Sequence, residues 1–209
     1  MSEKEKNMLS PKMQPVEKAG YTDRNWEEYA QFLDLTKEDL QKWQVIVDLG
    51  SGISQGLSYD LDKMGYKDKT VISIDPILGL LENPSNNLSQ EDLINLRSNA
   101  QPNTVAGLAQ ELPLKDESAD AILALFSVPR YLDKSDDINN FLDQVVRVLK
   151  PGGEARIYPI SKYKNNFKIV PDYLAQLSKN EFEYELILKR DDDGDPCYYL
   201  LIIRKKVKK

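Results

Sequence analysis

The feature that most constrains the fold of this chain is an apolar run that breaks into a turn containing two glycines. The run extends over residues 45–49, and the turn holds Gly50 and Gly52. A second apolar run follows at residues 70–74 and ends at Asp75. A strand, a glycine turn, a helix and a second strand tipped by a carboxylate form the arrangement with which open α/β sheets bind nucleosides. We therefore expect an α/β sheet that binds a nucleoside-containing ligand.

Strand and helix patterns alternate along the rest of the sequence. This alternation predicts βαβ units, and the nearly continuous apolar character of the strands is typical of a parallel sheet that is covered on both faces. We expect one doubly wound, mostly parallel sheet with helices on both faces. The expected strands span residues 45–49, 70–74, 104–106, 121–126, 155–158, 184–188 and 198–203.

Helical periodicity and capping signals indicate where the helices lie. The turn-rich acidic segment at residues 191–196 predicts a hairpin between the last two strands. We expect helices from Thr22 onward, from a capping box at Thr36, over residues 55–64, from a capping box at Ser89, from Ser135 to the Pro-Gly-Gly sequence at residues 151–153, and around Pro171, which is expected near the start of its helix.

Length and composition limit the number of domains and the class of partner. We expect residues 1–20 to form a mobile arm with too few apolar residues to order itself, and residues 21–209 to form a single domain. The formal charge of −6 provides no global positive field, so neither nucleic acid nor a membrane is an expected partner. One cysteine and no apolar run of membrane-spanning length favour a cytoplasmic protein. The oligomeric state stays open.

The spacing of the glycines separates two kinds of nucleoside site. A dinucleotide site of the G-x-G-x-x-G type needs a third glycine so that a helix N-terminus can approach a pyrophosphate. Gln55 occupies that position, and the next glycine, Gly56, comes one residue late. The alternative pattern, acid-x-Gly-x-Gly, is satisfied by Asp48, Gly50 and Gly52, and it lets a backbone without Cβ atoms pass beneath the amino-acid tail of a ligand. The spacing favours this second pattern.

The position of Asp75 supports the same interpretation. Asp75 lies 25 residues beyond Gly50, at the expected tip of the second strand, where a carboxylate can accept hydrogen bonds from both hydroxyls of a ribose. Each element alone also fits a structural turn with a solvated carboxylate. Together, the turn and Asp75 favour a nucleoside site.

Five sequence blocks in the expected order resemble the class I S-adenosylmethionine-dependent methyltransferases. VIVDLGSGIS resembles the first motif of that family, and VISIDP resembles its ribose-binding motif. Residues 107–114, 119–125 and 147–153 resemble the adenine-contacting loop, the fourth strand and the helix end before the fifth strand. The resemblance runs from about Tyr21 to the C-terminus. It implies a class I methyltransferase domain with a seven-stranded sheet whose last strand is antiparallel, and S-adenosyl-L-methionine as cofactor without a metal ion.

The resemblance also implies which residues contact this cofactor. Residues of the first motif would hold the methionine portion, and the second strand and the two later blocks would supply the remaining contacts. The implied positions are Asp48 near the methionine amino group, Gly50, Ser51 and Gly52 beneath the methionine portion, Asp75 and Pro76 at the ribose, Ala109 and Gln110 beside the adenine, and Phe126 near the transferable methyl group.

Two positions depart from the family pattern. Ser54 replaces the usual third glycine of the first motif, and Leu108 replaces an acid that the adenine loop often carries, which leaves the adenine amino group to Gln110 or to backbone carbonyls.

Three functions stay open. The first is a methyltransferase with an unidentified acceptor, for which a small molecule is the simplest expectation. The second is a non-catalytic protein that binds S-adenosylmethionine or S-adenosylhomocysteine, and the third is an NAD-type oxidoreductase, which Gln55 disfavours.

The sequence indicates the acceptor site only by position. Residues beyond the carboxyl ends of parallel strands line the ligand crevice of such sheets. The chain has no histidine, so any general base would be a carboxylate or a tyrosine. The fourth strand is not followed by the Asn/Asp-Pro-Pro-Tyr/Phe sequence of family members that methylate amino groups of bases or glutamine. The candidate substrate contacts are Ser127, Arg130, Tyr131, Tyr158 and Lys162, of which Arg130 also fits a surface ion pair and Tyr131 also fits core packing.

Overall fold

The computed structural model of the chain describes residues 24–81, 102–162, 164, 166–177, 179–190 and 196–207. The arm expected at residues 1–20, the helix expected from Ser89 and most of the acidic linker before the last strand lie outside the described residues.

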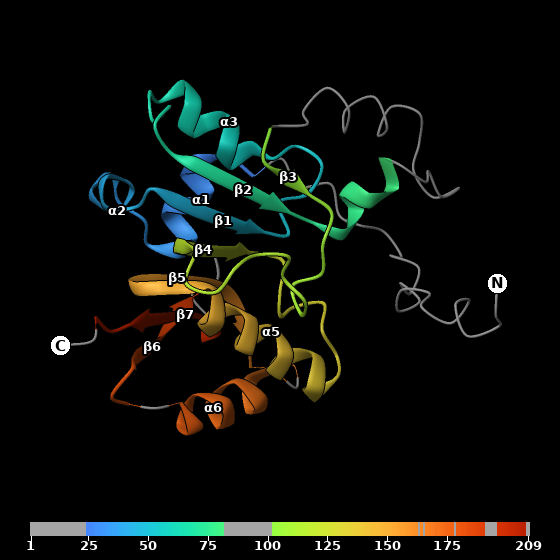
Figure 1. Cartoon of the computed structure of the whole chain (residues 1–209). Helices are drawn as coiled ribbons and strands as arrows, with labels where there is room; N and C mark the ends of the chain where they lie inside the picture. The colour runs from blue at the N-terminus through green and yellow to red at the C-terminus, as the bar shows by residue number, and fades with distance from the viewer. Residues whose placement is uncertain are drawn as a thin grey trace, which may run out of the picture.

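Seven strands form one sheet in the order β3-β2-β1-β4-β5-β7-β6 (Figure 1). The pairs from β3 through β5 are parallel, whereas β7 runs antiparallel to both β5 and β6. The expected sheet with an antiparallel last strand is therefore confirmed. The strands are β1 (Val45–Leu49), β2 (Thr70–Ile74), β3 (Thr104–Val105), β4 (Ala119–Leu125), β5 (Leu149–Ser161), β6 (Phe182–Arg190) and β7 (Pro196–Lys205).

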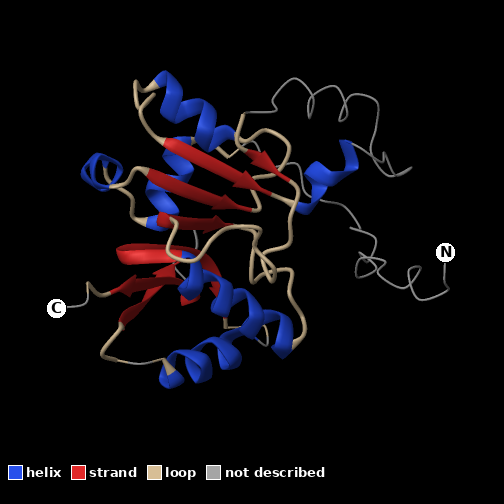
Figure 2. Ribbon diagram, viewed as in Figure 1, coloured by secondary structure: helices blue, strands red, loops and turns tan. Residues whose placement is uncertain are grey.

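Helices cover both faces of this sheet (Figure 2). Neighbouring residues of β1 point to opposite faces, as a strand requires. Ile46 packs in the cluster formed with the first three helices, whereas Val47 packs in the cluster formed with α5 and α6. The doubly wound architecture is thus confirmed. The helices are α1 (Trp26–Leu33), α2 (Lys37–Lys42) and α3 (Gly56–Lys63) on one face, and α5 (Ser135–Val148) and α6 (Asn166–Gln176) on the other, with a short 3-10 helix, η2 (Pro76–Leu81), after β2.

Capping boxes determine where α1 and α2 begin. The expected box at Thr36 is confirmed, because its hydroxyl accepts the Asp39 backbone N–H while the Asp39 carboxylate accepts the Thr36 N–H. A second box places Asn25 before α1, with Glu28 as its partner. The helix was expected from Thr22 onward, whereas α1 begins at Trp26, directly after Asn25 with its extended backbone.

Two further expected helix boundaries were wrong. The fifth helix ends at Val148, and the Pro-Gly-Gly sequence belongs to β5, where the pairing with β4 is irregular and Gly153 lies close to backbone carbonyls of β4. A Cβ on Gly153 would lie 2.9 Å from the Asp120 carbonyl oxygen, so glycine permits this close approach. Pro171 lies inside α6 and not near its start, because the helix begins five residues earlier at Asn166.

A buried arginine attaches the first two helices to the sheet. Arg156 of β5 pairs with Glu154 at 2.6 Å and with Asp39 of α2 at 3.1 Å, and it donates to the Leu33 carbonyl at the end of α1 at 3.0 Å. Because Arg156 joins the end of α1, the start of α2 and β5 through buried contacts, this network holds α1 in a defined position. The position matters because α1 contributes to the site described next.

Candidate cofactor site

The glycine turn lies where the strand order reverses, beside the carboxyl ends of β1 and β4. Gly50 has φ 72° and Gly52 has φ 68°, a left-handed conformation that glycine adopts without the steric cost of a side chain. The Gly50 N–H donates to the Ile74 carbonyl at 2.7 Å and so ties the turn to the end of β2. In open α/β sheets this switch point is the usual ligand crevice.

Asp75 holds the turn from the neighbouring strand. Its carboxylate accepts the Gly52 N–H at 3.0 Å through one oxygen and the Ile77 N–H at 2.9 Å through the other. Burial raises the pKa of this carboxyl, and the two backbone hydrogen bonds oppose the rise. Each carboxylate oxygen has capacity for a further hydrogen bond, so Asp75 can also accept from two hydroxyls. Pro76, the first residue of η2, follows it directly.

Asp48 lies fully buried beneath the turn. One carboxylate oxygen accepts the Tyr29 hydroxyl of α1 at 2.7 Å, and among the described residues the other has no hydrogen-bond partner. Burial raises the pKa of the Asp48 carboxyl to about 6, although the nearby Arg24 and the Tyr29 hydrogen bond lower it. A buried carboxylate with one free oxygen is suited to binding a cationic group.

Asp48→Asn should show how the protonation of this carboxyl affects stability. The folded-state pKa of about 6 exceeds the ordinary value, so the contribution of Asp48 is fully present below about pH 4 and is lost as pH rises through about 6. Asparagine does not ionise. The unfolding free energy of Asp48→Asn relative to the wild type should therefore rise by up to about 3 kcal/mol between pH 4 and pH 7. Urea unfolding at several pH values measures it, and a pH-independent difference would contradict the assignment.

Sequence reasoning missed Arg24. This side chain is only 5% exposed, and its two terminal nitrogens donate to the carbonyl oxygens of Gly50 and Leu125, at the ends of β1 and β4. Gly56 makes room for the Arg24 backbone, because a Cβ there would lie 2.0 Å from the Arg24 carbonyl oxygen. The sequence contained one signal for this contact. Gly56 lies one residue too late for a pyrophosphate motif, and in the structure it allows the Arg24 backbone to approach the start of α3.

The serines of the site have different surroundings. Ser127 is buried and donates to the Leu49 carbonyl at 2.6 Å, while its side chain fills the space beside Gly50. Ser127 therefore braces the turn from β4, and its hydroxyl already has a partner. Ser51 is also buried, and among the described residues its hydroxyl oxygen has no partner.

The loop after β3 carries the residues expected beside adenine. Leu108 and Glu111 form an isolated antiparallel bridge, and the Glu111 N–H donates to the Leu108 carbonyl at 3.1 Å. Ala109 and Gln110 occupy the turn between them, both partly buried, with Ala109 packed against the core. This loop follows β3, next to β2 in the sheet, so it lies on the same side of the switch point as Asp75.

An aromatic cluster joins α1, the residue after β4 and β5. Phe126 has φ 49° immediately after β4, and its ring contacts Phe32 of α1 and Tyr158 of β5 at centroid distances of 4.9 and 5.4 Å. Phe32 stacks on Tyr158 at 5.4 Å. Tyr158 is almost fully buried, so its ring belongs to the wall of the cluster, whereas Phe126 remains partly exposed.

Arg130 and Tyr131 lie on the surface of the loop after β4. Tyr131 is 66% exposed, so the core-packing alternative was wrong for this residue. The Arg130 guanidinium lies 5.9 Å from the Tyr131 ring centroid, and Lys164 donates to the Arg130 carbonyl at 2.9 Å. Lys162 is partly buried at the end of β5. Of the expected substrate residues after β4, Arg130 and Tyr131 are therefore exposed, whereas Ser127 is buried.

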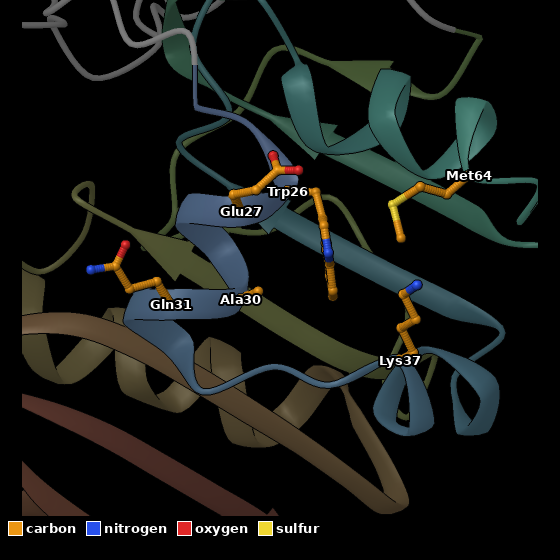
Figure 3. A pocket seen from close by; sticks show the side chains of 6 residues that line it. All are labelled: Trp26, Glu27, Ala30, Gln31, Lys37 and Met64. Carbon is orange, nitrogen blue, oxygen red and sulfur yellow. The ribbon is translucent and has the colours of Figure 1, made fainter.

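A surface groove of about 630 Å³ lies elsewhere, between α1, α2 and α3 (Figure 3). It contains none of the residues expected to bind cofactor or substrate. Within the described ranges, no group of His, Cys, Asp or Glu side chains could hold a metal ion, and no helix is long and apolar enough to cross a membrane. The residues that line the groove between α1, α2 and α3 are Trp26, Glu27, Ala30, Gln31, Lys37 and Met64.

Comparison with known proteins identifies the family. Residues 47–157, just over half of the chain, match the family described as "Methyltransferase domain". The chain therefore belongs to the methyltransferase domain family. It is a class I S-adenosylmethionine-dependent methyltransferase, and its cofactor is S-adenosylmethionine. No curated protein matches the sequence.

Solved structures share the fold at low sequence identity. A proposed S-adenosyl-L-methionine-dependent methyltransferase from Methanococcus maripaludis has 21% identity and a TM-score of 0.54, covering 88% of this chain and 84% of that one. A methyltransferase from Bacteroides fragilis, in complex with S-adenosyl-L-homocysteine, has 16% identity and a TM-score of 0.53, with coverages of 82% and 76%. An rRNA methylase from Streptococcus thermophilus has 12% identity and a TM-score of 0.51, with coverages of 81% and 93%.

The atoms of this crevice fit the cofactor chemically. The free oxygen of Asp48 and the carbonyls of Gly50 and Leu125 are acceptors for an ammonium group, and Asp75 can accept from ribose hydroxyls. The buried Ser51 hydroxyl is a further polar group that lacks a partner among the described residues.

Proposed function

We propose that this enzyme transfers the methyl group to a small molecule with an aromatic or otherwise flat apolar portion. The observation that carries the proposal is the aromatic cluster of Phe32, Phe126 and Tyr158. The partly exposed Phe126 follows Leu125, whose carbonyl lies in the cofactor crevice. An acceptor ring packed against Phe126 would therefore lie close to the reactive end of the cofactor.

The proposed contacts of the cofactor follow the geometry of the crevice. The turn and the buried carboxylate beneath it bind the methionine portion, the tip of β2 binds the ribose, and the loop after β3 lies beside the adenine. The residues assigned in this way are Asp48, Gly50, Ser51 and Gly52 for the methionine portion, Asp75 and Pro76 for the ribose, Ala109 and Gln110 for the adenine, and Phe126 beside the methyl group.

The chemistry required of the protein is positioning. S-adenosylmethionine, when bound, supplies an electrophilic methyl group on a sulfonium. The glycine turn and Asp75 fix one side of the crevice, and the aromatic wall places the acceptor opposite and excludes water. An aromatic ring such as that of Phe126 also attracts a nearby positive charge. A dedicated general base is not required for an acceptor that is already nucleophilic.

The substrate residues divide into two groups in this proposal. Ser127 and Tyr158 shape the wall, because the Ser127 hydroxyl already donates to backbone and Tyr158 is buried. Arg130 and Tyr131 line the entrance, where an acidic substituent of the acceptor could pair with the guanidinium. Lys162 would add a second cation at this entrance.

RNA is the competing acceptor class, since two of the structural neighbours are described as rRNA methylases. The formal charge of −6 argues against RNA, because RNA binding depends on neutralising phosphates with lysine and arginine.

The proposal also includes the domain extent and the location of the enzyme. A single domain extends from residue 21 to residue 209. The enzyme is cytoplasmic, in keeping with a chain that contains one cysteine.

Transfer of labelled methyl groups tests the proposal. We expect S-adenosylmethionine labelled on its methyl group to modify members of a panel of phenols, indoles and aromatic carboxylates, and not ribosomal RNA. Phe126→Ala should reduce kcat/KM for the best acceptor by about tenfold, because an aromatic contact and its buried area are lost. Tyr59→Ala, which removes a 52% exposed aromatic ring from α3, is the matched control. Label found in RNA alone would overturn the small-molecule proposal.

A further inference from the structure

Arg24 places a cation of the protein itself at the switch point. Its two terminal nitrogens donate to the carbonyls of Gly50 and Leu125, which end the neighbouring strands β1 and β4. The side chain is 5% exposed, and its positive charge opposes the rise that burial causes in the pKa values of Asp48 and Asp75. The guanidinium is therefore surrounded by acceptors at the base of the crevice.

These acceptors would also serve the amino-acid tail of a cofactor. The tail ends in an ammonium group, which needs carbonyl or carboxylate oxygens when water is excluded. Gly50 and Leu125 supply two carbonyls, and Asp48 supplies a buried carboxylate with one free oxygen. A guanidinium and an ammonium on the same two carbonyls would place two positive charges side by side in a buried site, where water cannot screen their repulsion.

We propose that Arg24 fills the ammonium position of the cofactor site and thereby determines which ligands bind. Its guanidinium must leave the carbonyls of Gly50 and Leu125 before a ligand with an ammonium-bearing tail can bind, whereas a nucleoside without the tail binds with Arg24 in place. This inference rests on the proposed assignment of the methionine portion to the glycine turn.

The geometry permits the side chain to move while its backbone stays fixed. The Arg24 carbonyl lies against Gly56, and the Trp26 N–H donates to the Asp60 carboxylate at 2.8 Å, so both positions are anchored to α3. The Nε of Arg24 has no partner among the described residues. Displacement therefore requires a change of rotamer and the loss of the hydrogen bonds to two carbonyls, and α1 does not need to shift.

Two adenosyl thioethers distinguish the contribution of the tail to binding from that of the nucleoside. S-adenosyl-3-thiopropylamine carries the ammonium but no carboxylate, and 5′-methylthioadenosine has no amino-acid tail. We expect Arg24→Met to bind the thiopropylamine roughly tenfold more tightly than the wild type does, because hydrogen bonds of a charged donor no longer have to be broken. Affinity for methylthioadenosine should stay unchanged. Lys63→Met, which removes an exposed positive charge from the end of α3, should change neither.

The outcomes of this titration calorimetry distinguish the inference from the proposed function. An unchanged or weaker affinity of Arg24→Met for the thiopropylamine, with methylthioadenosine still bound, would overturn the inference while the proposed function stands. If Arg24→Met fails to bind methylthioadenosine, Arg24→Lys tests the inference in its place. The single nitrogen of lysine cannot reach both carbonyls, so Arg24→Lys should bind the thiopropylamine roughly threefold more tightly than the wild type does. Failure of wild type and variants alike to bind these nucleosides or S-adenosylhomocysteine would remove the proposed function itself.

Discussion

Asp75→Ala is expected to weaken the binding of S-adenosylhomocysteine by about 100-fold. In the proposed site Asp75 accepts from two ribose hydroxyls, and hydrogen bonds to a charged group contribute about 1.5–3 kcal/mol each, so a loss of about 3 kcal/mol is a conservative total. The same change removes the acceptor for the Gly52 and Ile77 N–H groups, which loosens the turn beneath the ligand. Isothermal titration calorimetry of the purified variant measures the effect.

A matched control lies at the opposite end of the same strand. Asp68 precedes β2, its side chain is 64% exposed, and its Ala variant should bind S-adenosylhomocysteine as the wild type does. Asp75→Asn should lie between the two, because the amide keeps one acceptor oxygen and replaces the other by a donor. Wild-type affinity in Asp75→Ala, with the fold intact by circular dichroism, would remove Asp75 from the cofactor site.

The sheet could be predicted because its determinants are local. The strands β1 and β2 have the bounds expected from their apolar runs, and the turn at Gly50 and Gly52 adopts the left-handed conformation that glycine permits. Capping at Thr36 was equally readable, since both partners lie within four residues. The sequence order of these signals also indicated the crevice at the switch point.

The contacts that complete the site could not be predicted because they join distant segments. Arg24 reaches Leu125 across 101 residues, and Tyr29 reaches Asp48 from a helix whose periodicity indicated only a buried face. Ser127 was expected to contact substrate from its position after β4, but its hydroxyl binds the Leu49 carbonyl. Position after a strand places a residue at the crevice; whether its side chain faces ligand or backbone depends on three-dimensional packing.

Gly50→Ala is expected to destabilise the protein by about 4 kcal/mol. Alanine at φ 72° costs about 1–2 kcal/mol, and its Cβ would lie 2.3 Å from the Ser127 Cβ and 2.9 Å from the Ser127 Oγ, an overlap that costs about 1–3 kcal/mol to relieve. The strand β4 behind Ser127 is buried, so the overlap cannot be relieved toward solvent. Urea unfolding monitored by circular dichroism gives the change in unfolding free energy.

Two substitutions of Ser127 separate backbone strain from overlap. Ser127→Gly removes both atoms that the new methyl group would meet, so the double variant with Gly50→Ala should cost about 1–3 kcal/mol less than the sum of the single changes. Ser127→Ala keeps the Cβ, the nearer of the two atoms, and should recover much less. Equal recovery by both would show that overlap with the Ser127 Cβ is not the cause. A cost that persists when Gly50→Ala is combined with Ser127→Gly measures the strain of placing alanine in the left-handed backbone conformation of Gly50.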